Sequence, residues 1–230
     1  MSDAPDTPLH VRTYQTSIDE VVRLIEIHKQ LSGDRRGRRH NMEVLNKSAV
    51  VLLVACWEAY IEDLATTAFE YMLTQVTDAN AIPARVLVSA VEGLKNSQDA
   101  RAVWALAGDG WRAVLQAHKA DVLLDHVKGL NTPRHKQIDS MFDSLLGLRW
   151  LSNGWRWQGM TVARSRDKLD GLVTLRGDIA HRVAASTSVL KRDVIDYAEF
   201  IWRLATTSSN SVRAHLIQFT PGEPWAAYSM

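Results

Sequence analysis

Three residues in one stretch of the sequence have side chains suited to proton transfer and phosphate binding. Arg176 and His181 stand five positions apart, and Asp178 lies between them. Histidine is the side chain whose ordinary pKa lies closest to neutrality, so His181 can accept and donate protons. Arginine keeps its charge in any protein, and its planar fork of donors suits a phosphate group. Asp178, three residues before the histidine, can orient the imidazole or raise its pKa.

The stretch from 165 to 185 is predicted to form an amphipathic helix. Its apolar residues recur at steps of three and four, which places them on one stripe: Leu169, Leu172, Val173, Ile179, Ala180 and Val183. At about 100° per residue, Arg176 falls in the middle of this stripe, whereas His181 is turned roughly 140° away. A buried, unpaired charge is unfavourable, so Arg176 needs either a partner or a task.

Residue spacing alone leaves the roles of these side chains open. Arg176 can be a structural residue that pairs with Glu58 or Glu62 across the core, in which case the glutamate ties two helices together. Asp178 and Arg182, four apart, can form a surface ion pair worth roughly 0.2–0.5 kcal/mol. The histidine can equally be a solvated side chain with no chemical role.

The same stretch resembles a known protein superfamily. Arg176-Gly-Asp-Ile-Ala-His181 fits the R-x4-6-H motif of the HEPN superfamily, and the surrounding sequence is similar to its RiboL-PSP-HEPN branch and to a related branch. The supporting stretches are Leu53–Ile61, which reads LVACWEAYI, and Asp143–Leu148, which reads DSLLGL. The likeness covers roughly residues 49–204.

The resemblance implies a metal-independent endoribonuclease without a cofactor. RNA carries its own nucleophile, the 2′-hydroxyl beside the scissile phosphate, so such an enzyme needs only proton transfer and positive charge. The resemblance assigns these roles to His181 and Arg176, with Asp178 beside them. The product would carry a 2′,3′-cyclic phosphate, and relatives in this superfamily serve as toxins or anti-phage defence effectors.

The separation of Arg176 and His181 around the helix also favours a homodimer. Two copies of the helix that face each other across a two-fold axis can each complete the other's site. We therefore expect an all-α, HEPN-like helical bundle with the motif helix at a homodimer two-fold. The expected partners are RNA, a second copy of the chain, and a cognate antitoxin or a neighbouring defence protein.

Gly177 departs from the pattern of many HEPN ribonucleases, which carry Asn or another polar residue directly after the arginine. This departure keeps open a second hypothesis, a non-catalytic module for dimerisation or partner binding. A third hypothesis is a nucleotide- or ligand-binding helical domain that assists an enzyme encoded nearby. We expect Glu58, Gly177 and Arg182 to support the site rather than to react.

Two further stretches are rich in the residue types that contact RNA in other proteins, arginine and tryptophan. One loop carries four arginines, which either hold phosphates with an affinity that falls with salt or are simply solvated: Arg35, Arg36, Arg38 and Arg39. Trp155-Arg156-Trp157 combines aromatic faces with a cation, as a base-stacking platform does. Tryptophans in an irregular segment more often cover a core, and we favour that interpretation here.

Composition excludes several classes of protein. The net charge of +1 gives no overall sign of a nucleic-acid binder, and the single Cys56 excludes an internal disulfide framework. No H-E-x-x-H, paired Cys/His spacing or Gly-rich phosphate loop is present, so we predict neither a metal site nor a nucleotide-hydrolysing site. The first residues lack an apolar signal core, and no apolar run approaches the length of a membrane span. We therefore expect a cytoplasmic protein with no membrane partner.

Periodicity predicts a single helical domain over residues 16–215, with tails at 1–15 and 216–230. The expected helices cover 17–31, 41–74, 85–94, 100–107, 111–127, a segment that opens at Pro133, 165–185 and 186–210. The longest is apolar on every side between Ala49 and Trp57, which indicates a buried central helix. The glycine-interrupted segment 147–159 is expected to be a loop.

Overall fold

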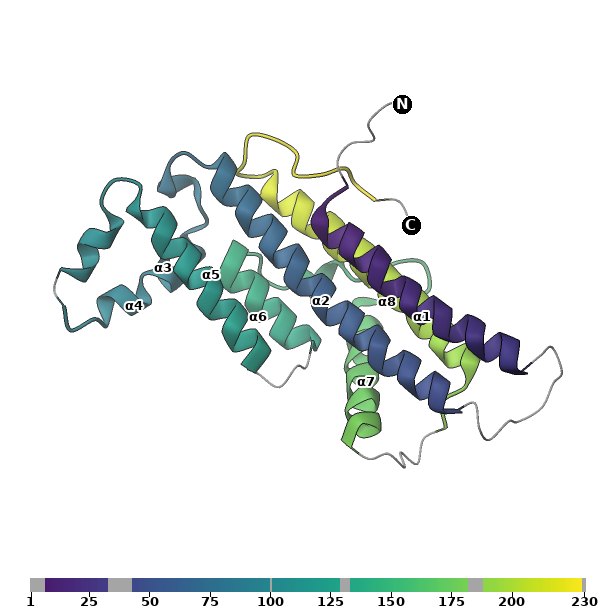
Figure 1. Cartoon of the computed structure of the whole chain (residues 1–230). Coiled ribbons are helices and arrows are strands. Elements are labelled where there is room, and N and C mark those ends of the chain that lie inside the picture. The colour runs from purple at the N-terminus through teal and green to yellow at the C-terminus, as the bar shows by residue number, and fades with distance from the viewer. Residues whose placement is uncertain (1–6, 33–42, 100, 129–132, 182–187, 229–230) are drawn as a thin grey trace.

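The structure, a computed structural model, describes residues 7–32, 43–99, 101–128, 133–181 and 188–228. Within these ranges the chain is all-α, which confirms the predicted fold class (Figure 1). The helices are α1 Leu9–Ser32, α2 Glu43–Gln75, α3 Ala84–Ala90, α4 Glu92–Lys95, α5 Gly110–Lys128, α6 His135–Leu146, α7 Val162–His181 and α8 Lys191–Leu216. Three 3-10 turns join them: η2 Ala79–Ala81, η3 Ala102–Leu106 and η4 Leu151–Gly154.

The long helix α2 forms the centre of the bundle, as its all-round apolar sequence predicts. It contacts α1, α5, α6, α7 and α8, and Figure 1 shows it running diagonally between α1 and α8 on one side and α5 and α6 on the other. By length and composition α2 could also cross a membrane, but half of its most apolar window is buried inside the bundle. Its place among five helices accounts for that composition.

Several predicted boundaries are wrong: among them, the predicted helix 85–94 is divided into α3 and α4, and α7 begins at Val162 rather than at residue 165. α1 begins at Leu9, so residues 9–15 are helical and not part of an N-terminal tail. Pro8 supplies the carbonyl that accepts from the N–H groups of Val11 and Arg12, and a proline at the start of a helix is compatible with its geometry. The predicted helix 100–107 is the short 3-10 turn η3, and α8 continues to Leu216.

The C-terminal segment after α8 is not helical, as predicted, but it packs against the bundle rather than forming a free tail. Asn210 on α8 donates to the carbonyl of Tyr228, and Arg213 donates to the carbonyl of Trp225. Trp225 is buried against the ring of His10, with 4.9 Å between the ring centroids. This segment therefore covers the place where α1 begins, against the middle of α2.

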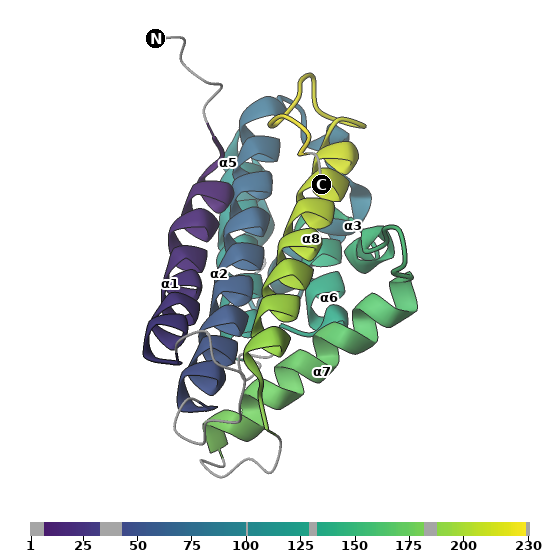
Figure 2. The ribbon, with the colours of Figure 1, turned by 90° about the vertical axis from the view of Figure 1, so that its right-hand side faces the viewer.

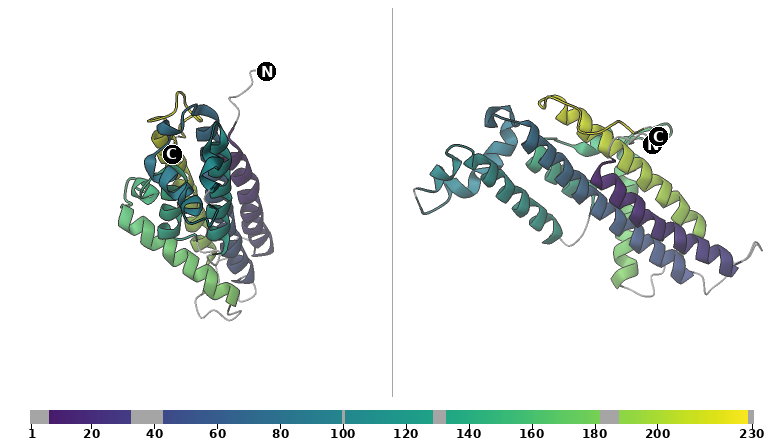
Figure 3. Two further views of the ribbon diagram at one scale, coloured as in Figure 1. Left: turned by 90° about the vertical axis from the view of Figure 1, so that its left-hand side faces the viewer. Right: turned by 45° about the horizontal axis from the view of Figure 1, so that its top comes forward.

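At the other end of the bundle, α7 crosses beneath the remaining helices, and its last turn lies near the starts of α2 and α8 (Figure 2). Residues at the start of α6 fix its position. His135 bonds the carboxylate of Asp170 through its backbone N–H and Nδ1, at 3.2 and 2.9 Å. Arg134 donates to the carbonyl of Asp170 and to the hydroxyl of Thr174, at 2.9 and 3.0 Å. By contrast, α4 and η3 extend past one end of the bundle (Figure 3), beyond α3, which packs against α5 and α6.

Candidate functional site

Arg176 lies on the side of α7 that faces the bundle, as the spacing predicts. Leu169, Leu172 and Val173 on the same stripe are buried. The arginine itself is half-buried, and its Nε is buried with no hydrogen-bond partner among the described residues. A permanent cation with an unused donor therefore sits at the edge of the core.

Glu58 on α2 is the carboxylate whose charge is coupled to Arg176. Burial raises the pKa of Glu58 above its usual value, and the positive charge of Arg176 opposes that rise. Even so, no ion pair in the described part of the chain includes Arg176. The glutamate therefore lies near the guanidinium without neutralising it in a direct pair, and Glu62 does not pair with it either.

His181 and Asp178 lie on the outside of the same helix. His181 is the last residue of α7, and both side chains are exposed, with no hydrogen bond or ion pair to another described residue. Gly177 is half-buried, and a Cβ added there would meet nothing within 4 Å. The motif thus presents its arginine to the core edge and its histidine to the surface.

Several predicted site residues lie outside the described residues. These are Arg182, which follows α7 directly, and the four arginines of the basic loop, Arg35, Arg36, Arg38 and Arg39. Their roles stay predictions.

The base-stacking interpretation of Trp155-Arg156-Trp157 is wrong for its first member. Trp155 is fully buried, and its Nε1 donates to Ser208 on α8 at 2.8 Å. Trp157 is partly buried, with its ring 6.1 Å from that of Phe200. These two tryptophans cover the core, as the favoured alternative predicts, because the loop folds back onto α8.

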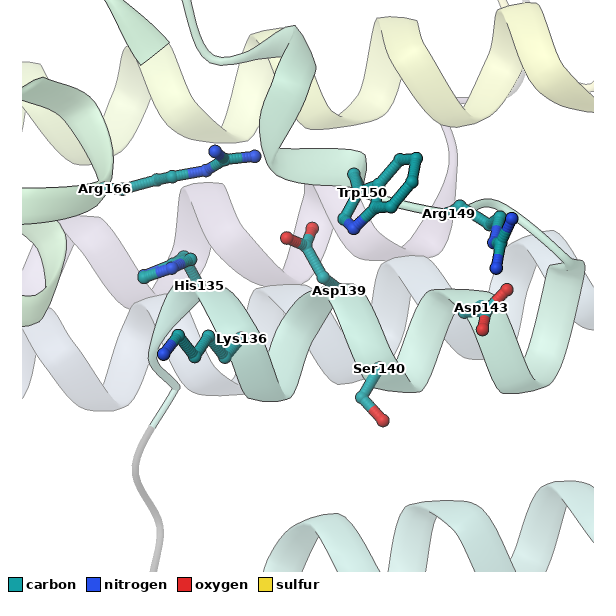
Figure 4. Close-up of a pocket in the computed structure, with 8 residues that line it drawn as sticks. All are labelled: His135, Lys136, Asp139, Ser140, Asp143, Arg149, Trp150 and Arg166. Carbon is teal, nitrogen blue, oxygen red and sulfur yellow. The ribbon is translucent and has the colours of Figure 1, made fainter. Parts of the chain in front are cut away.

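A cavity of about 450 Å³ lies between α6, the turn that follows it and the start of α7 (Figure 4). It is lined by three cations, Lys136, Arg149 and Arg166, by the carboxylates of Asp139 and Asp143, and by the exposed ring of Trp150. We call it the α6 pocket. Sequence reasoning missed it because its residues come from three segments that only the fold brings together; the one local signal was the adjacent pair Arg149-Trp150.

The described residues offer proton transfer and anion binding rather than metal ligation. Among them, no group of three His, Cys, Asp or Glu side chains could hold a metal ion. The chemistry available at the end of α7 is that of one exposed imidazole and one guanidinium, held on opposite sides of a helix.

Comparison with known proteins identifies one family. A family model described as RiboL-PSP-HEPN matches residues 13–212, a range that runs from the first turns of α1 into α8 and includes all of α7. No curated protein and no solved structure is significantly similar to the chain.

Proposed function

The chain belongs to the RiboL-PSP-HEPN family, and we propose that it is a metal-independent endoribonuclease whose working residues are Arg176 and His181. The observation that carries the proposal is the guanidinium of Arg176. It is held at the core edge, has no ion pair in the described part of the chain, and has a buried Nε without a hydrogen-bond partner. A buried charge with unused donors is unfavourable for the fold alone, which favours a role in binding an anion.

In the proposed reaction, RNA supplies the nucleophile. A base removes the proton from the 2′-hydroxyl, the 2′-oxygen attacks the adjacent phosphorus, and the bond to the 5′-oxygen breaks as that oxygen takes up a proton. His181 performs one of these proton transfers; it is exposed at the end of α7, and its ring nitrogens bond no other described residue. Arg176 holds the non-bridging oxygens as negative charge develops on them. The products are a 2′,3′-cyclic phosphate and a 5′-hydroxyl.

The geometry of α7 supports an active site shared between two copies of the chain. The buried Nε of Arg176 and the exposed ring of His181 lie on opposite sides of one helix, so a single phosphate cannot easily meet both. A two-fold axis beside the last turns of α7 places the histidine of one copy near the arginine of its partner. Asp178, also exposed there, orients the imidazole in this arrangement.

Cleavage of a single-stranded RNA by the full chain, in EDTA, tests the proposal. We expect the wild type to cut, and Arg176→Ala and His181→Ala to lose activity while their melting temperatures stay near that of the wild type. Arg23→Ala, at an exposed arginine on α1, is the matched control and keeps full activity. Intact RNA with pure, folded wild-type protein at high concentration would refute the nuclease.

Co-expression of the two inactive variants tests the shared site. In a mixed dimer, one of the two sites combines the intact Arg176 of one copy with the intact His181 of the other. Random assortment makes half of the dimers mixed, so about a quarter of the wild-type activity returns. If mass spectrometry demonstrated mixed dimers but no cleavage activity returned, both residues of each site would belong to one copy.

The biological setting that we propose follows from the superfamily. The nuclease acts in the cytoplasm as a toxin or an anti-phage defence effector, restrained by an antitoxin or a neighbouring defence protein. The alternative is a non-catalytic module for dimerisation or partner binding, and Gly177 is the observation that favours it. Undiminished partner binding by His181→Ala, together with inactive wild type, would decide for the module.

A further inference from the structure

The three cations of the α6 pocket have no carboxylate partners. Arg166 donates from Nε to Ser152 at 2.8 Å and from Nη2 to Asn153 at 2.7 Å, both neutral acceptors. Lys136 and Arg149 have no hydrogen bond or ion pair with any other described residue. Two carboxylates, Asp139 and Asp143, also line the cavity, and Asp143 pairs with Arg85, so positive charge is in excess there and favours an anion.

The carboxylates of the pocket are already engaged by the protein. Both oxygens of Asp139 accept from Ser152, at 2.8 Å from its N–H and 2.6 Å from its hydroxyl. Asp143 accepts from Arg85 through Oδ2 at 3.1 Å, whereas its Oδ1 is buried without a hydrogen-bond partner among the described residues. The chain from Asp139 through Ser152 to Arg166 also holds the guanidinium in place, and Figure 4 shows Arg166 reaching from α7 toward Asp139.

Trp150 gives the pocket an aromatic face in a strained position. It is the one non-glycine residue among those described with positive φ, at 55°, and its side chain is 56% exposed. A bulky residue in the left-handed region is disfavoured, and such strain gathers at functional sites. The guanidinium of Arg149 lies 5.2 Å from the ring centroid. An exposed indole beside a cation is the arrangement that stacks a nucleobase.

The pocket lies on the same side of α7 as the histidine of the motif. Arg166 and His181 are fifteen residues apart, which in a helix turns them only about 60° from each other and separates them by about 22 Å. Between them, Arg134 lies across the helix, bonded to Thr174 and to the carbonyl of Asp170, without a carboxylate partner among the described residues. The Asp170 carboxylate on this path is bonded to His135.

We propose that the α6 pocket binds an unpaired nucleotide of a single-stranded RNA, with its base stacked on Trp150 and its phosphate held by Arg166, Lys136 and Arg149. From the pocket the strand runs along α7, past Arg134, to His181. The path of the strand toward His181 rests on the proposed nuclease function. Binding in the pocket itself does not depend on cleavage, because the cations and the ring are present in the single chain.

Binding of an RNA that cannot be cut tests the pocket separately from catalysis. The probe is a fluorescein-labelled, single-stranded 2′-O-methyl oligonucleotide, which lacks the nucleophile, and the readout is fluorescence anisotropy with the full chain. Trp150→Gly removes the ring at a position where glycine accepts the backbone, so the fold is retained. We expect about tenfold weaker binding, in the range of base stacking on aromatic side chains. Trp104→Ala, at a tryptophan 74% exposed on η3, is the matched control and binds like the wild type.

Two further probes and a lysine variant show whether binding depends on the base, on the phosphates or on a continuous strand. An abasic oligonucleotide of the same length should bind Trp150→Gly and wild type equally, because it has no base to stack. Lys136→Gln should weaken the binding of both probes. It should also reduce the slope of log affinity against log salt concentration by about one, whereas Lys95→Gln on α4 should change neither. Adenosine monophosphate should compete only weakly; full displacement by it at micromolar concentration would mean that the pocket takes free nucleotides and not a strand.

The outcomes distinguish the pocket from the nuclease. Unchanged oligonucleotide binding by Trp150→Gly, or an equal loss with the abasic probe, would overturn the pocket even if Arg176 and His181 prove catalytic. Weaker binding by Trp150→Gly with an inactive wild type would keep the pocket and refute only the nuclease.

Discussion

Two regions of the bundle, the start of α1 and the end of α7, place histidines in opposite surroundings. At the start of α1, His10 is fully buried, its ring lies 5.7 Å from Tyr60 and 4.9 Å from Trp225, and its Nε2 is 3.3 Å from the hydroxyl of Ser209. At the end of α7, His181 is exposed and bonded to no other described residue. We call these the packed end and the motif end.

The difference separates histidines that stabilise the fold from those available for chemistry. Burial lowers the pKa of His10 to about 4, so this imidazole stays neutral near pH 7 and cannot exchange protons with a ligand that never reaches it. An exposed imidazole at a helix end can do so. The packed end should therefore respond to mutation through stability, and the motif end through activity.

Substitution at the motif end should give the largest effect. His181→Ala removes the proton-transfer group, and we expect RNA cleavage to slow by about 10²–10⁴-fold. Because the side chain is exposed, the midpoint of urea unfolding should not change. The comparison fails if the variant instead unfolds more easily and, per folded molecule, cuts as fast as the wild type.

Substitution at the packed end should give the converse result. Tyr60 is buried, and its hydroxyl donates to the carbonyl of Ala205 at 2.7 Å. Tyr60→Ala should lower the free energy of unfolding by about 3–5 kcal/mol, as for other large aromatic residues replaced in a core. Tyr60→Phe keeps the ring and loses only the hydrogen bond, about 1 kcal/mol. Chemical unfolding measures both, and cleavage per folded molecule should match the wild type.

The pH dependence of stability should arise at the packed end. Because the pKa of His10 falls from 6.5 to about 4 on folding, the unfolded chain binds more protons between these values. The free energy of unfolding therefore decreases as pH falls from 6.5 toward 4, by at most about 3 kcal/mol from this group.

His10→Phe is the variant that isolates this effect. Burial also lowers the pKa of His126, so the informative quantity is the difference between wild type and variant in unfolding experiments at several pH values. That difference should grow as the solution is acidified through the window. His181→Ala is the matched control, and its free energy of unfolding should depend on pH as that of the wild type does. If both variants lost the same part of the pH dependence, the effect would come from the overall charge of the protein and not from the buried His10.

Local sequence patterns predicted the motif end well. The steps of three and four around Leu169 and Leu172 correctly turned Arg176 toward the bundle, because a helix face depends only on residues within the helix. They also placed Ala180 on the buried stripe, but Ala180 is exposed and Arg176 is only half-buried, because the last turns of α7 lie at the edge of the core. The all-round apolar composition of α2 predicted its central position for the same reason. At the packed end the prediction failed, because Pro5 and Pro8 indicated a tail while the helical start at Leu9 is stabilised by distant partners such as Trp225.

The α6 pocket shows why sites assembled from several segments escape sequence analysis. Arg166 belongs to α7, Lys136 to α6 and Trp150 to the turn between α6 and η4, so no spacing rule connects them. The positive φ of Trp150 is also invisible in the sequence, since glycine is the residue that normally marks such a position. Only the backbone path after Gly147 reveals it.

The smallest expected effect concerns two glycines of α7, and it distinguishes a change in stability from a change in dimerisation. Gly171 and Gly177 both lie inside α7, and a Cβ at either meets nothing within 4 Å. Replacing a helical glycine with alanine stabilises a helix by roughly 0.5–1 kcal/mol, so both substitutions should raise the melting temperature slightly. If a second copy approaches α7 at the motif, as the shared site requires, Gly177→Ala should also weaken dimerisation and cleavage several-fold. Gly171→Ala, nearly two turns away, should leave both unchanged. Equal behaviour of the two variants in light scattering and in cleavage would mean that the motif turn of α7 faces solvent and that each chain works alone.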